Sequence, residues 1–124
     1  MSDHENRTLL EDLLARGVDD WVYAAEVHDI ARRSSLVEPD LVRMLAIGLI
    51  AEALSRGLMA AGDFDGSSHR PWECSVGEAI ARIQDEWLGW GTEAPTPGAI
   101  VWLDVTPAGR EIGERVLARE QTPH

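Results

Sequence analysis

The chain has 124 residues, a length that suits a single domain with a real hydrophobic core. It carries 22 acidic residues against 11 arginines and no lysine, which gives a formal net charge of -11. A negative field of this size repels nucleic acid and attracts basic partners. The alternative interpretation is that the charge only keeps the protein soluble.

The single cysteine, Cys74, excludes an internal disulfide framework and a cysteine-based zinc site. The first ten residues contain no apolar signal core, and no stretch is long enough to cross a membrane. We therefore expect a cytoplasmic protein that does not act in a membrane.

The first forty residues predict two helices. A capping box, T-x-x-E, begins at Thr8, and the leucines that follow form one stripe until Gly17, which suits a helix end. Asp19 or Asp20 would cap a second helix over residues 21–33. Several of its apolar residues recur at helical spacing and should face the core: Tyr23, Ala24, Val27, Ile30 and Ala31.

A long apolar helix and a strand follow. Pro39 suits the first helical position, and Gly57 suits the end. A helix so apolar must pack on several sides. We expect a strand over residues 58–64, closed by a turn that begins at Asp63. The residues that cover well over half of the helix are Leu41, Val42, Leu45, Leu49, Ile50, Ala53 and Leu54.

The region from 65 to 98 is predicted to hold one more helix. Residues 67–73 read as a loop with a rigid corner at Pro71-Trp72. A second capping box begins at Ser75, and the helix that it opens should run to about Trp90 with a narrow apolar seam. Residues 91–98 read as a linker.

The last part of the chain predicts a strand and a closing helix. From residue 99 to 105, apolar residues alternate in a way that is typical of a half-buried strand, with Val101, Leu103 and Val105 on one face. Thr106 would cap the last helix, which runs to about residue 119. Its two glycines, Gly109 and Gly113, lie one turn apart and would let this helix approach another closely.

This order of elements resembles that of a winged-helix domain. Residues 41–58, with the wording ALSRGLMAAGDF at and after the helix end, resemble the recognition helix and first wing strand of MarR-like and PadR-like regulators. VWLDVTPAGR, from Val101 to Arg110, is similar to their second wing strand and the entry to the next helix. The resemblance covers roughly residues 20–64 and 99–119. It implies a mainly helical α+β fold, winged-helix-like, with a small antiparallel β-hairpin and an inserted helix.

The sequence differs from MarR-like and PadR-like regulators in two features that DNA binding requires, the wing and the basic residues of the recognition helix. A wing is usually a tight hairpin, whereas residues 65–98 separate the two strands here. The helix that would enter the major groove carries only Arg43 and Arg56 as basic residues, and it lacks the usual set that reads base edges. Phosphate contacts need a basic stripe. We therefore accept the fold and not its usual function.

Candidate chemical sites are weak. His28 lies near Glu26 and Asp29 on the second predicted helix, but Glu26 and His28 do not share a face. His69 and Cys74 flank the Pro71-Trp72 corner without a third orienting group. Asp63-x-Asp65-Gly66 resembles half of a calcium loop, but no bidentate glutamate closes it. We therefore expect no catalytic set, no metal site and no cofactor.

The first hypothesis is a small acidic domain that binds a basic surface on another protein. Its sharpest form is the neutralisation of a toxin that acts on nucleic acid, as immunity proteins and antitoxins do. The alternative is a winged-helix transcription regulator that kept DNA binding, in which a homodimer could gather Arg32, Arg33, Arg43, Arg56 and Arg70 on one face. Tryptophan is enriched at interface hot spots. The candidate contact residues are Asp19, Asp20, Asp63, Asp65, Trp72, Asp85, Glu86 and Trp90.

Overall fold

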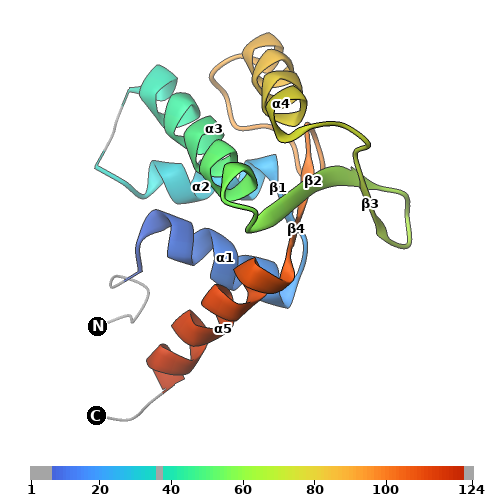
Figure 1. Cartoon of the computed structure of the whole chain (residues 1–124). Helices are drawn as coiled ribbons and strands as arrows, with labels where there is room; N and C mark the ends of the chain where they lie inside the picture. The colour runs from blue at the N-terminus through green and yellow to red at the C-terminus, as the bar shows by residue number, and fades with distance from the viewer. Residues whose placement is uncertain (1–6, 36–37, 122–124) are drawn as a thin grey trace.

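The computed structural model describes residues 7–35 and 38–121. In this part of the chain, five helices and a four-stranded antiparallel sheet form a mainly helical α+β fold (Figure 1). In chain order the elements are α1 (Leu9–Asp19), β1 (Val22–Tyr23), α2 (Ala24–Arg32), α3 (Pro39–Ser55), β2 (Met59–Phe64), β3 (His69–Pro71), α4 (Val76–Trp90), β4 (Trp102–Val105) and α5 (Pro107–Gln121).

The sheet has the strand order β1-β4-β2-β3. Strand β2 lies antiparallel to β4, with Met59 opposite Val105 and Ala61 opposite Leu103. The two segments that the sequence predicts as partner strands therefore pair, although some forty residues separate them. In Figure 1 the hairpin of β2 and β3 projects away from the helices.

One face of the sheet supplies the core, as the alternation in the sequence predicts. Val101, Leu103 and Val105 are all buried, and the residues between them are only half-buried. Leu49 and Ile50 of α3 are buried too. Leu41 is not buried. One side of the first two turns of α3 faces solvent, and there Leu41 is 43% and Met44 63% exposed. Helix α3 thus packs on several sides as predicted, but its first turns leave Leu41 outside the core.

Local capping fixes the helix ends. The capping boxes at Thr8 and Ser75 are both formed. Hydrogen bonds to the ionised side chains lower the pKa of Glu11 and Glu78. Gly57 adopts a left-handed φ of 69° after α3. The backbone N–H groups of residues 57 and 58 donate to the carbonyls of residues 54 and 53, which makes a Schellman end.

Two predicted helix boundaries were wrong. Helix α1 does not end at Gly17 but continues to Asp19, and Gly17 instead allows close contact with Val105 of β4. The second helix begins at Ala24, without a side-chain cap from Asp19 or Asp20. The two residues before it form β1, because pairing with β4 competes successfully with the helical pattern.

The predicted loop over residues 67–73 also needs correction. His69–Pro71 form β3, which pairs with β2 so that Phe64 lies opposite His69. A tight hairpin is therefore present after α3, and helix α4 comes after it. Helix α4 packs on α3 and buries Trp87 completely. The segment before β4 is thus part of the same core.

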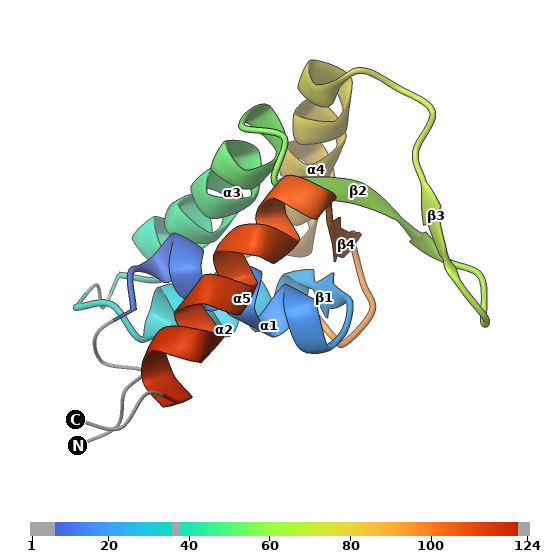
Figure 2. The same cartoon turned by 60° about the horizontal axis from the view of Figure 1, so that its bottom comes forward.

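Helix α5 lies along α1 (Figure 2). Gly113 faces the backbone of α1, where an added Cβ would lie 2.6 Å from the carbonyl oxygen of Leu14. Thr106 accepts a hydrogen bond from the N–H of Gly109 at 3.2 Å, and its hydroxyl donates to the carbonyl oxygen of Gly57 at 2.6 Å. The predicted cap and the predicted close approach are both confirmed.

Candidate functional site

The charged surface is the feature that the sequence singles out, and the structure shows how its charges are distributed. Within the described residues, nine of the eleven arginines form ion pairs with carboxylates of this chain. Since acidic residues outnumber arginines two to one, many carboxylates remain without such a pair in the described residues. The internal pairing therefore removes most of the positive charge from the surface but leaves much of the negative charge.

Four of the five arginines that a DNA-binding face would need already form ion pairs within the chain. The fifth, Arg32, has no ion pair within the described ranges. Exposed pairs of this kind are individually weak, yet each places a negative charge where a phosphate would have to bind. The four pairs are Arg33 with Asp29 at 3.3 Å, Arg43 with Asp40 at 3.3 Å, Arg56 with Glu52 at 3.4 Å and Arg70 with Asp65 at 2.6 Å.

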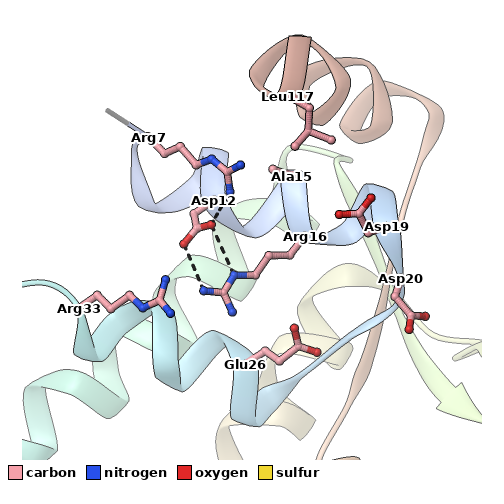
Figure 3. A pocket seen from close by; sticks show the side chains of 9 residues that line it. All are labelled: Arg7, Asp12, Ala15, Arg16, Asp19, Asp20, Glu26, Arg33 and Leu117. Carbon is pink, nitrogen blue, oxygen red and sulfur yellow. Dashed lines mark hydrogen bonds and ion pairs between the residues drawn. The ribbon is translucent and has the colours of Figure 1, made fainter. Parts of the chain in front are cut away.

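A hollow of about 540 Å³ is lined by residues of α1, α2 and α5 (Figure 3). Arg16 crosses it and lies 3.4 Å from Asp12 and 3.7 Å from Asp29. Arg7 lies 2.9 Å from Asp12 and also pairs with Glu120 of α5, which raises the pKa of Arg7. The alternating charges satisfy one another and join the helices, so this network has a structural role.

Three acidic side chains lie on the outer part of the same hollow. Asp19 and Asp20, both predicted contact residues, are exposed there, and Glu26 is half-buried beside them. Burial raises the pKa of Glu26, while the nearby Arg16 opposes that rise. This corner of the molecule therefore presents unpaired negative charge to solvent.

The β2–β3 hairpin carries two more of the predicted contact residues, and they differ. Asp63 is exposed and lines a shallow hollow with His69 and Trp72. Asp65 instead builds the turn: its carboxylate accepts hydrogen bonds from the N–H groups of residues 67 and 68, both at 2.9 Å, and pairs with Arg70. These contacts hold the pKa of Asp65 well below its usual range. The half calcium loop is thus a turn.

The other four predicted contact residues are associated with α4. Trp72 packs against the core, and the guanidinium of Arg82 lies 3.8 Å from its ring centroid. Arg82 also pairs with Glu86 at 3.2 Å. Asp85 and Trp90 are exposed. The eight predicted residues therefore occupy three regions, at the α1–β1 connection, on the hairpin and on or beside α4.

The histidines and the cysteine take separate positions. His28 is buried on α2, and its pKa is lowered by burial and by Arg32, while Asp29 opposes that shift. The ring of His69 forms a hydrogen bond with the carbonyl oxygen of Trp102 at 2.9 Å. Cys74 is exposed. Over residues 7–35 and 38–121, no three potential ligands gather in a metal-binding group, and no helix has the length and apolar character to cross a bilayer.

Sequence reasoning missed an aromatic cluster on the outer face of the sheet. Its members are Trp21, Tyr23, Phe64 and Trp102, and their ring centroids lie 5.0 to 5.3 Å apart in a chain. The helical spacing predicts a core position for Tyr23, but Val22 takes the core position and Tyr23 faces the other side. The available signal was the spacing of two between Trp21 and Tyr23, which is that of one strand face.

Comparison of the chain with protein-family models, with curated proteins and with solved structures found no match.

Proposed function

We propose that this protein is a small non-enzymatic domain that binds a basic protein. The observation that carries the proposal is the internal pairing of nine arginines, which leaves an excess of carboxylates without an ion pair on the part of the surface that the structure describes. Such a surface speeds association with a cationic partner and disfavours a polyanion. Asp19, Asp20, Asp63 and Asp85 are exposed members of it.

The sharpest form of this proposal is a toxin-neutralising protein of the immunity or antitoxin type that works in the cytoplasm. A toxin that acts on nucleic acid needs a basic surface to bind its phosphates. An acidic domain that covers this surface blocks the toxin without any chemistry of its own. The small size and the strong negative charge of the chain support this role.

The winged-helix resemblance gains support from the sheet order. In the arrangement proposed, β1, β4 and β2 are the three strands of the small sheet, α3 is the helix before the wing, and the β2–β3 hairpin is the wing itself. Helix α4 then lies between the wing and the strand that returns to the sheet. This differs from the sequence interpretation, in which β2 and β4 alone made the wing.

That fold supports a second candidate function, DNA binding by a transcription regulator. The position of α3 favours it, and a homodimer could gather arginines from two copies. The charges oppose it, because Arg43 of α3 and Arg56, which directly follows α3, are each paired with a carboxylate of that helix. We therefore rank DNA binding second.

Capture from the native host at low salt tests the proposal. We expect a tagged protein to retain one basic protein in near-stoichiometric amount, and the purified pair to re-form a complex that weakens as salt rises, because exposed charges are screened. The variant with Asp19, Asp20, Asp63 and Asp85 changed to Asn serves as the comparison and should bind more weakly. If the reconstituted complex instead involves an acidic or neutral partner and ignores both salt and these four changes, the proposal is wrong.

A further inference from the structure

We propose that the outer face of the sheet docks an arginine side chain of the basic partner. The face is formed by the aromatic cluster defined above, Trp21, Tyr23, Phe64 and Trp102, and is called the aromatic face below. This inference rests on the proposed function and deepens it by naming the contact.

Strand register builds the aromatic face. Tyr23 of β1 lies opposite Trp102 of β4, and Trp102 lies opposite Gly62 of β2. The ring of Trp102 on β4 lies 5.0 Å from the ring of Phe64 on β2. Trp21 then contacts Phe64 at 5.1 Å. Four rings from three parts of the chain thus form one continuous surface.

The aromatic face does not belong to the core. Val22, Ala61 and Leu103 of the same strands are buried on the opposite face. The four rings keep partial exposure, and Phe64 is 38% exposed. Clustered aromatic side chains that are left open to solvent mark interaction sites more often than chance, and Trp and Tyr supply much of the binding energy at interfaces.

Negative charge borders the aromatic face and decides the chemistry of its partner. Asp104 follows Trp102 by two residues and so lies on the same face of β4. A hollow of about 230 Å³ is lined by Trp21 and Asp104 together with Asp19 and Asp20. Its one cationic residue is Arg110, whose Nη1 donates to the carbonyl oxygen of Val18 at 3.5 Å. Three carboxylates against one guanidinium leave this border negative.

Aromatic faces beside carboxylates fit arginine better than any other side chain. The planar guanidinium stacks on an aromatic ring, is held there by cation–π attraction, and can donate two hydrogen bonds to a carboxylate. The chain already contains this arrangement, since Arg82 lies 3.8 Å above Trp72 and pairs with Glu86. On the aromatic face the rings and carboxylates are present and the arginine would come from the partner.

The test uses the indole N–H signals of the five tryptophans in the ¹⁵N-labelled full chain. The probe is an acetylated and amidated Gly-Arg-Gly-Arg-Gly peptide, and the comparison is the same peptide with lysine. We expect the arginine peptide to shift the Trp21 and Trp102 signals in a saturable way, to leave Trp87 unmoved, and to bind more tightly than the lysine peptide. Shifts confined to Trp90, or equal binding of both peptides, would overturn the proposal.

Two isosteric variants distinguish binding at the aromatic face from binding through the net charge of the protein. Asp104→Asn removes a carboxylate at the aromatic face, and Glu114→Gln removes an exposed one on α5 with the same change in net charge. We expect Asp104→Asn to weaken binding of the arginine peptide by roughly two- to fivefold, the value of one exposed charge pair, and Glu114→Gln to leave the affinity unchanged. Equal losses in both variants would show that only net charge matters. A captured basic partner that binds both variants as tightly as the native chain would refute the aromatic face while the proposed function stands.

Discussion

Replacement of Gly109 by alanine should destabilise the domain by about 1–3 kcal/mol or more, the range for overpacking in a rigid core. An added Cβ at this position would overlap the carbonyl oxygen of Leu58 and lie 2.9 Å from its carbonyl carbon. That oxygen already accepts the N–H of Thr106 at 3.0 Å. Because the neighbour is backbone, it cannot rotate away, and α5 would have to separate from the start of β2.

Gly48→Ala is the matched control for Gly109→Ala. Gly48 lies exposed in the middle of α3, and nothing lies within 4 Å of its added Cβ. Alanine there should raise stability by about 0.5–1 kcal/mol, because glycine weakens a helix interior. Chemical denaturation followed by circular dichroism measures both. Similar small effects in the two variants would mean that α5 does not approach Leu58 so closely.

Truncation of Trp87 to alanine should cost about 3–5 kcal/mol, the usual loss for a large buried aromatic side chain. Trp87 is 0% exposed and is the largest fully buried side chain of the described residues. This loss is a large share of the stability of a small domain, so the variant should be partly unfolded at room temperature. The effect would establish that α4 belongs to the core.

Trp90→Ala controls for the loss of a tryptophan from the same helix. Trp90 is 42% exposed at the end of α4, and we expect its truncation to lower the free energy of unfolding by less than about 1 kcal/mol. Thermal unfolding monitored in the far ultraviolet compares the two. If Trp87→Ala and Trp90→Ala unfold at the same midpoint temperature, α4 does not contribute to the core and the description of a single core is wrong.

The fold was largely predictable from the sequence because its strongest signals are local. The capping boxes at Thr8 and Ser75, the glycine stop at Gly57 and the alternation through Val101–Val105 each depend on neighbours in the chain. The structure bears all of them out. The pairing of β2 with β4 was also predictable, since a half-buried strand needs a partner and few candidates were present.

The two short strands could not be predicted, because their existence depends on distant residues. Val22–Tyr23 and His69–Pro71 are strands only through pairing with β4 and β2. Pro71 at a strand end argues against a strand when the sequence is read alone. Gly17 was assigned to a helix end because nothing local reveals that Val105 packs against it.

The charge of the candidate site was predictable, and its geometry was not. The composition predicts a negative surface, but the pairing of the arginines with carboxylates depends on the fold. The aromatic face was missed for the same reason as β1, since Trp21 and Phe64 are 43 positions apart in sequence and meet only when the sheet forms. Asp65 and Trp72, two predicted contact residues, contact Arg70 and Arg82 within the chain.

A side-by-side titration at about 50 mM salt tests the central claim most directly, because phosphate contacts are strong under these conditions. One arm follows a fluorescently labelled DNA duplex as the protein is added, and the other follows the arginine peptide. We expect saturable, salt-sensitive binding of the peptide and no change in the anisotropy of the duplex up to roughly 100 µM protein, where ordinary nonspecific DNA binders are bound. Saturable binding of the duplex together with no binding of the peptide would contradict the central claim.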